Sequence, residues 1–375
     1  MASPRSRSRR YGSATVVISL VVVGVVLVVA LGPARPSRET ALRVLSTSPP
    51  SGASDVGWDT PIRVRLSEPL TSAAQLPHLS PSIPGRWTWR STTTVVFHPR
   101  AFLAPGATYE VSIPVATRGT LEHQRTTTLR FTVALASVTR LQQLLAELGY
   151  LPVSFVPAGA TAADALASEP TVASSISPSP QAGAFGWRYR ATPPELRVLF
   201  RAGFWSALDQ GAVMAFEAEN RLPVNGIPEA NVWSALLAAV ASRRSDPVPF
   251  TYLVASEARP ERLDVWSGGR VIVTTLVNTG APGASTPLGT WPVRLRFAST
   301  TMRGTNPNGT RYVDPGVPDV AYFNGSVAVH GFPRAAYGFP QSNGCVEVPL
   351  SMAATVFRYD PIGTPVTVTS RALTS

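Results

Sequence analysis

The stretch Ser326-Val-Ala-Val-His330-Gly331, followed by Ser342-Asn-Gly-Cys345-Val-Glu-Val-Pro349, decides the fold of the C-terminal part of this chain. Each half joins a short apolar run, typical of a buried strand, to a glycine. The chain has 1 cysteine, Cys345, and its last histidine is His330. We expect a strand that ends at His330, a loop, and a return that ends at Cys345, so that thiol and imidazole meet.

A thiol and an imidazole within hydrogen-bond reach are the parts of a cysteine nucleophile and its base. Gly344 permits a tight backbone beside the thiol. The backbone amides of Asn343 and Gly344 are candidate donors to an oxyanion, and Ser342 is a candidate turn cap or imidazole partner. The alternative is structural: Cys345 as a small buried side chain and His330 as a turn residue. Spacing alone leaves both open.

Three motifs resemble the catalytic domain of L,D-transpeptidases, the YkuD-type family: STPLGTWPV at 285–293, AVHGF at 328–332 and QSNGCVEVP at 341–349. The resemblance covers about residues 248–370 and implies a β-rich catalytic domain. It implies that Cys345 is the nucleophile and His330 the proton acceptor and donor. It also implies peptidoglycan stem peptides as substrates, a thioester intermediate, and cross-links as products.

Further site residues follow from the same resemblance. Ser342 is expected to support the nucleophile, and Tyr322, Phe323 and Gly331 to bind the donor stem. The alternative for the two aromatic residues is packing in the core. No cofactor or metal is expected, because one cysteine and one histidine do not form a zinc site.

Two positions depart from the family pattern. Asn343 stands where histidine is usual, and Glu347 stands where a basic or amide residue is common. Glu347 either raises the pKa of the nearby thiol or contacts a cationic amine of the acceptor. The sequence leaves these two interpretations open.

Two other functions use the same motifs. The first is a peptidoglycan carboxypeptidase or endopeptidase, in which water instead of an amine takes the acyl group from Cys345. The second is a wall-anchored scaffold without catalysis. The intact Ser342, Gly344, Cys345 and His330 argue against the scaffold.

The N-terminus predicts a membrane anchor. Arginines gather in residues 1–13, and an uncharged, Val-rich run follows at 14–31. Such a run is long enough to cross a bilayer, and the arginines favour the cytoplasmic side. We expect a single-pass membrane protein with residues 32–41 as linker and everything beyond outside the membrane. A cleaved signal peptide that releases the protein to the cell wall is the alternative.

Short β runs separated by Pro- and Gly-rich turns fill residues 42–136, and they predict a β-sandwich. STSPPSGASDVGWDTPIRVRLSEPL at 46–70 and FHPRAFLAPGATYEVSI at 97–113 resemble a bacterial Ig-like domain. His78, His98 and His123 lie in this region, far apart in sequence and without a cysteine nearby. We interpret them as surface or turn residues.

Residues 138–242 predict a small helical domain. Apolar residues recur at helical spacing over 138–148 and stop at Gly149, and further helices are expected at about 210–220 and 229–240. Both ends of the region resemble a peptidoglycan-binding domain. The longer centre, 152–190, is expected to be an insertion, flexible where it is rich in Ala, Ser and Pro. A spacer without a binding groove is the alternative.

The predicted protein is multidomain and mainly β. Its 36 prolines and 28 glycines favour strands, turns and linkers over long helices. The net charge of +11 suits an anionic cell wall. No cluster of arginines with interleaved aromatic residues indicates nucleic-acid binding. The expected partners are peptidoglycan and, through the N-terminal helix, the membrane.

Overall fold

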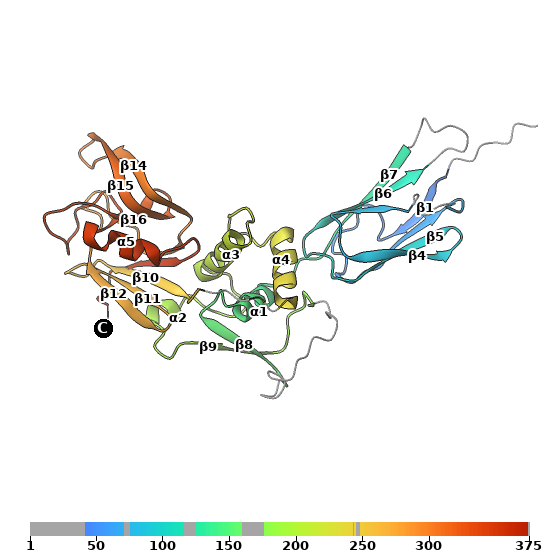
Figure 1. The fold of residues 1–375 in the computed structure, drawn as a ribbon, viewed down its shortest axis with the longest axis horizontal. Coiled ribbons are helices and arrows are strands. Elements are labelled where there is room, and N and C mark those ends of the chain that lie inside the picture. The colour runs from blue at the N-terminus through green and yellow to red at the C-terminus, as the bar shows by residue number, and fades with distance from the viewer. Residues whose placement is uncertain are drawn as a thin grey trace, which may run out of the picture. The chain divides into compact units, whose positions relative to one another are not determined.

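The first described strands form two antiparallel sheets that enclose one core (Figure 1). One sheet has the order β1 (Val44–Ser48), β2 (Ile62–Leu66), β5 (Thr94–Pro99), β4 (Gly85–Ser91); the other has β3 (His78–Ser80), β6 (Thr108–Val115), β7 (Arg125–Thr132). In β2, the apolar residues of Ile-Arg-Val-Arg-Leu are buried and the arginines exposed, as strand alternation requires. This region is therefore the predicted β-sandwich.

The computed structural model describes residues 42–70, 76–115, 125–159, 176–242, 244 and 248–373. The predicted basic segment, membrane helix and linker at 1–41 lie outside these residues, as does His123. Within the described part, no helix is both long and apolar enough to span a membrane.

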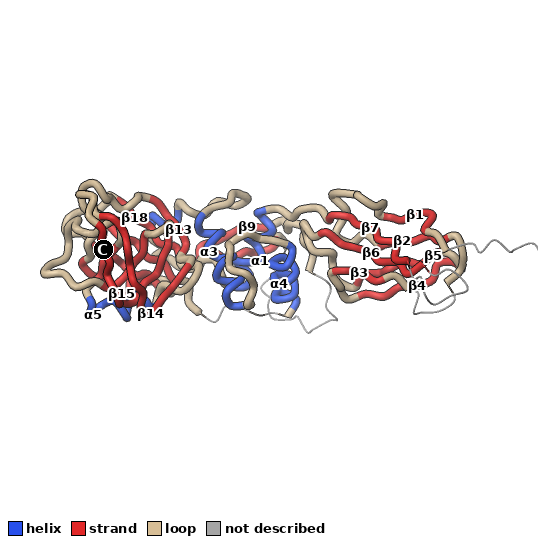
Figure 2. Tube along the Cα trace, turned by 90° about the horizontal axis from the view of Figure 1, so that it is seen from above, coloured by secondary structure: helices blue, strands red, loops and turns tan. Residues whose placement is uncertain are grey.

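Residues 138–242 contain α1 to α4, and Figure 2 shows helices in blue. They are α1 (Val138–Leu148), α2 (Pro194–Arg197), α3 (Ala207–Glu219) and α4 (Ala230–Ala241). Ser137 caps the start of α1, and Gly149 ends it in a left-handed conformation at φ 103°. The long helices lie close to where the apolar spacing predicted them.

The predicted insertion is more ordered at its ends than expected. β8 (Val153–Pro157) and β9 (Gly183–Trp187) pair as an antiparallel ribbon. Phe155 and Phe185 pack with ring centroids 5.1 Å apart, and Phe185 packs in turn on Phe200. This aromatic packing, which the prediction overlooked, gives the ribbon a partly buried side. Residues 160–175 lie outside the described part.

Two sheets and one helix make up residues 251–369. The first sheet has the order β12 (Arg270–Leu276), β11 (Arg262–Ser267), β10 (Thr251–Ser256), β18 (Pro365–Thr369), β13 (Gly289–Pro292). The second has β14 (Leu295–Thr305), β15 (Arg311–Asn324), β16 (Val327–Gly331), β17 (Val346–Val348). A shared apolar core, to which α5 (Leu350–Arg358) contributes, holds both sheets together.

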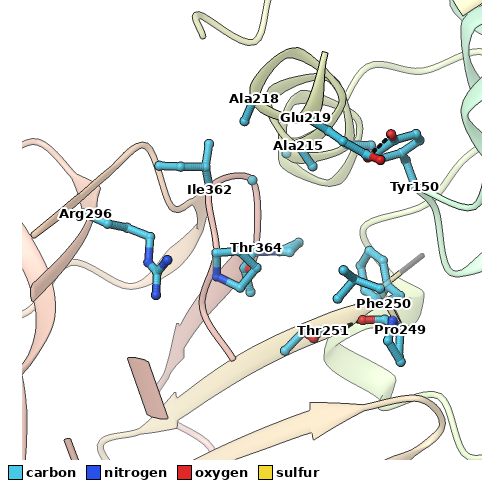
Figure 3. Close-up of a pocket in the computed structure, with 16 residues that line it drawn as sticks. Tyr150, Ala215, Ala218, Glu219, Pro249, Phe250, Thr251, Arg296, Ile362 and Thr364 are labelled. Atoms are coloured by element: carbon cyan, nitrogen blue, oxygen red, sulfur yellow. Dashed lines mark hydrogen bonds between the residues drawn. The ribbon is translucent and has the colours of Figure 1, made fainter. Parts of the chain in front are cut away.

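The helical region packs directly on the first of these sheets. Tyr252, Val254 and Trp266 belong to the same core as α1, α3 and α4, and Trp266 Nε1 donates to Ala191 O at 3.1 Å. Residues of α3, the stretch 248–251 and the stretch 361–365 line a cavity of about 400 Å³, and Figure 3 shows Ala215 and Ala218 in its wall. Tyr150 donates a hydrogen bond to Glu219 at its edge.

Candidate active site

A parallel strand pair brings the predicted nucleophile and base together. β16 and β17 pair with Val329 opposite Val346 and His330 opposite Glu347. Cys345 immediately precedes β17 and packs against Ala328. Since side chains alternate along a strand and adjacent strands lie about 4.8 Å apart, Cys345 and His330 share one face of the sheet. The thiol thus lies just before the return strand, whereas the sequence predicted it at that strand's end.

His330 is almost fully enclosed, with 3% of its surface exposed. Its Nδ1 lies 3.0 Å from Gly331 O, and its ring meets Phe332 edge-on at 5.9 Å. Burial lowers the pKa of His330, so the imidazole is neutral at pH 7. A carbonyl only accepts hydrogen bonds, so Nδ1 carries the proton in this neutral form. Nε2 then holds the lone pair that a general base needs.

Cys345 is a free thiol with a partly exposed side chain. Its Sγ lies 3.8 Å from Ser326 O. Burial raises the pKa of Cys345 to about 11, opposed by a backbone hydrogen bond from Ala328 and assisted by the charge of Glu347. The resting site therefore holds a protonated thiol and a neutral imidazole. A base that takes the proton as the thiol attacks suits this state.

Ser342 fixes the loop that presents the thiol. Its buried hydroxyl donates to Cys345 O at 2.6 Å and accepts from Gly344 N at 3.1 Å. Gly344 adopts φ +104°, which side chains other than glycine rarely reach. The Gly344 N–H, one of the two predicted oxyanion donors, already donates to Ser342 Oγ. It is therefore not available to an oxyanion in this structure. Ser342 acts through the loop backbone.

Asn343 projects from the same loop toward a neighbouring hairpin. Its Nδ2 donates to Asn306 Oδ1 at 2.7 Å. Asn306 lies in the turn between β14 and β15. Asn343 thus ties the loop before Cys345 to the tip of the β14–β15 hairpin.

A buried carboxylate supports this loop from below. Glu261 is 1% exposed and accepts hydrogen bonds from Thr279 N at 2.6 Å and Thr279 Oγ1 at 2.9 Å. The Thr279 carbonyl accepts in turn from the amides of Gln341 and Ser342, both at 2.9 Å. Thr286, from the first motif, accepts from Gly280 N at 2.9 Å in the same segment. Glu261 and Thr279 were not predicted, because nothing in sequence marks a buried glutamate.

The predicted donor-binding residues have different surroundings. Tyr322 is half-buried beside the thiol, and it packs with Cys345 around Ala328. Phe323 points the other way along β15, is 2% exposed and packs with Trp291 in the core. Gly331 is buried, and a Cβ there would lie 2.7 Å from Ala353. Phe323 therefore packs in the core, as the alternative interpretation expected. Gly331 allows close packing on Ala353, and its carbonyl oxygen accepts a hydrogen bond from His330 Nδ1.

Glu347 is neither free nor open to a substrate amine. It is 4% exposed, and Arg334 donates to both of its oxygens at 2.8 Å, from Nε and Nη2. Of the two interpretations left open by the sequence, contact with the acceptor amine does not fit the structure, because Arg334 engages both oxygens inside the protein. Its charge does raise the pKa of Cys345, as the other interpretation expected, although burial is the larger cause.

Tyr312 joins Tyr322 near the thiol. Tyr312, on β15, is half-buried, and burial followed by the charge of Cys345 raises its pKa. The pKa of Tyr322 is raised by the same causes. Of the other predicted histidines, His78 and His98 are exposed on the sandwich.

Comparison with protein families identifies the domain that holds this site. Residues 251–368 match the model described as the L,D-transpeptidase catalytic domain. This part of the chain is an L,D-transpeptidase catalytic domain. Residues 38–136 match the bacterial Ig-like domain, which confirms the identity of the sandwich. Neither match includes the helical region, whose likeness to peptidoglycan-binding domains stays a prediction.

Solved structures similar to the chain are also L,D-transpeptidases. An L,D-transpeptidase from Mycobacterium smegmatis is 15% identical over 89% of this chain and 100% of its own, with a TM-score of 0.29. L,D-transpeptidase 3 from Mycobacterium tuberculosis, in complex with a faropenem-derived adduct, is 16% identical over 87% of this chain and 97% of its own, with a TM-score of 0.29. The catalytic domain from E. faecium L,D-transpeptidase is 27% identical over 33% of this chain and 99% of its own, also with a TM-score of 0.29. No curated protein sequence matches the chain.

Proposed function

We propose that the transpeptidase domain cross-links peptidoglycan stem peptides through a Cys345 thioester, with His330 as general base. The register of the β16–β17 pair carries this proposal, because it sets the thiol and the imidazole on one face of adjacent strands. The family match gives the reaction class. The tautomer that Gly331 favours leaves His330 Nε2 as proton acceptor.

In the first half-reaction, Nε2 takes the proton of Cys345 as Sγ attacks the carbonyl carbon of the bond between an L-centre and a terminal D-amino acid. The tetrahedral intermediate collapses, the C–N bond breaks, and the imidazolium gives its proton to the leaving amine. An acyl thioester on Cys345 remains. General base assistance of this kind contributes about 10²–10⁴-fold to rate.

In the second half-reaction, the amine of another stem attacks the thioester and Nε2 takes its proton. The C–S bond breaks, the proton passes to Sγ, and the cross-link leaves the enzyme. The backbone N–H of Asn343 is the proposed oxyanion donor, since the Gly344 N–H is engaged by Ser342. Tyr322, beside the thiol, is proposed to line the donor site.

We also propose the predicted location: a single-pass membrane protein anchored by residues 14–31, with the catalytic domain outside. The Ig-like and helical domains then stand between anchor and active site, and they raise the local concentration of enzyme at the wall. Glycan binding by the helical domain is part of this proposal.

Product analysis separates transpeptidation from its alternatives. The purified chain is incubated with tetrapeptide muropeptides, and the products are weighed by mass spectrometry. Cross-linked dimers that disappear in Cys345→Ala support the proposal. Shortened monomers alone would assign a hydrolase that uses the same pair, and unchanged substrate would leave only the scaffold.

A further inference from the structure

The loop between base and nucleophile, residues 332–341, contains a charged side chain that the mechanism has not used. Arg334 donates through Nε and Nη2 to the two carboxylate oxygens of Glu347, each at 2.8 Å. This bidentate geometry is the strongest form of ion pair. The guanidinium is partly exposed, with 29% of the side chain accessible, whereas the side chain of Glu347 is only 5% exposed.

The pair also closes the loop mechanically. Arg334 Nη2 donates to Gln341 O at 3.4 Å, and the Arg334 guanidinium lies over the Phe332 ring at 4.7 Å. The Tyr337 hydroxyl accepts a hydrogen bond from Arg334 N at 3.1 Å and donates one to Phe332 O. Phe332 in turn packs edge-on against His330. One arginine therefore connects both ends of the loop to β17 and to the ring beside the imidazole.

The position of Glu347 gives this contact a chemical meaning. Glu347 lies directly opposite His330 and two residues after Cys345, on the face that carries both. A buried carboxylate there opposes formation of a thiolate unless a cation balances it. The described charged and titratable groups acting on Cys345 and His330 come from β15, β17 and the loop: Tyr312, Asp314, Tyr322, Glu347 and Arg334. Arg334 is the cation of this group.

We infer that Arg334 is a positioning residue for the Cys345–His330 pair, which neutralises the buried Glu347 carboxylate and holds the loop 332–341 against β17. The inference deepens the proposed function and rests on it. It explains how this chain accommodates an acidic residue two places after its nucleophile: the balancing charge comes from the preceding loop.

The test follows alkylation of the single cysteine by iodoacetamide across pH, in the full-length chain and three variants. Arg334→Met leaves Glu347 charged and unpaired, so alkylation should shift to higher pH and slow about three- to tenfold at pH 8, given tenfold per pKa unit. Glu347→Gln leaves the cation alone, so the profile should shift to lower pH. Arg334→Met combined with Glu347→Gln should return close to wild type.

Arg130→Met is the matched control, because Arg130 makes an exposed ion pair with Glu110 in the Ig-like domain. It should leave the profile unchanged. If Arg334→Met does not fold, Glu347→Gln and the double variant still decide, since neither leaves a buried charge unpaired. The inference would be overturned if the alkylation profiles of Arg334→Met, Glu347→Gln and the double variant all superimposed on that of wild type. It would also be overturned if the double variant were alkylated as slowly as Arg334→Met.

Alkylation does not require transpeptidation, so the two proposals fail separately. Opposite shifts in the single variants with no peptide product from wild type would contradict the proposed function alone. Cross-linking by wild type with unshifted profiles would contradict the role of Arg334 alone. With both intact, Arg334→Met should lower kcat for cross-linking more than it changes KM.

Discussion

Ser342 donates its buried hydroxyl to the carbonyl of Cys345 at 2.6 Å, and the same oxygen accepts from Gly344 N. This one side chain closes the turn that presents the Cys345 thiol. The turn is therefore built before substrate arrives, and the thiol does not depend on the substrate for its position. Preorganisation of this kind is where small displacements cost most in rate.

Replacement of Ser342 by alanine should lower both activity and stability. Two hydrogen bonds are lost and the Gly344 amide is left without its partner, which costs about 1–3 kcal/mol. We expect kcat for cross-linking to fall at least about tenfold, because the thiol loses its fixed position. Thermal unfolding and muropeptide assays measure the two effects. Ser326→Ala is the control, since Ser326 meets the thiol through its carbonyl and keeps it; equal losses in both variants would refute the role of Ser342.

Replacement of Gly344 by alanine tests the backbone of the same turn. The residue has φ +104°, and an added Cβ would lie 3.4 Å from Ala284 O, so the strain comes from the backbone. A left-handed conformation costs about 1–2 kcal/mol for other residues, and we expect cross-linking to drop as the turn relaxes. Gly52→Ala, at φ +85° with open space around it, should cost similar stability and leave activity intact. Normal activity in Gly344→Ala would contradict a required turn.

Glu261→Gln tests the support beneath the loop. The carboxylate accepts twice from Thr279, and an amide replaces one acceptor by a donor that faces another donor. A stability loss of about 1–3 kcal/mol is expected, together with a lower kcat at similar KM. Glu257→Gln alters a less buried neighbouring carboxyl and should have little effect. Calorimetry and initial rates make the comparison, and an unchanged kcat in Glu261→Gln would show that the support is dispensable.

The pH dependence of kcat/KM follows from the directions of the two pKa shifts. Burial lowers the pKa of His330 below its ordinary 6.5, so the base is lost only as pH falls below that value. Burial raises the pKa of Cys345 to about 11, so thiolate formation does not limit the profile near neutrality. We expect a flat region around pH 7 to 9 and an acid limb below pH 6.5. An acid limb above pH 7 would indicate that His330 is not the base.

The sequence predicted the residues of this site whose types are rare in the chain. Cys345 and His330 are distinctive because the chain offers 1 cysteine and 4 histidines, and the glycine motifs give their backbone context. The alternation in Ile62–Leu66 and the helical spacing in Val138–Leu148 could also be predicted from sequence. In each element one side packs against apolar residues and the other side is more polar. These signals are local.

The contacts that sequence reasoning missed are between distant residues. Glu261 reaches Thr279, and Arg334 reaches Glu347, only after the strands have paired. The resemblance placed both Tyr322 and Phe323 at the donor site, with core packing as the alternative, yet alternation along β15 sends the two rings to opposite faces. The ribbon β8–β9 was missed because its two halves are separated by the Ala- and Ser-rich centre of the insertion.

Peptide mass mapping of the acylated chain shows whether the thioester forms on Cys345. The full-length chain is incubated with a tetrapeptide donor and no acceptor, quenched in acid and digested. We expect one modified peptide, containing Cys345, whose added mass equals the donor minus its terminal D-amino acid. The adduct should be absent in Cys345→Ala and form far more slowly in His330→Gln. An acyl adduct on another residue, or product release by Cys345→Ala at the wild-type rate, would contradict the thioester on Cys345.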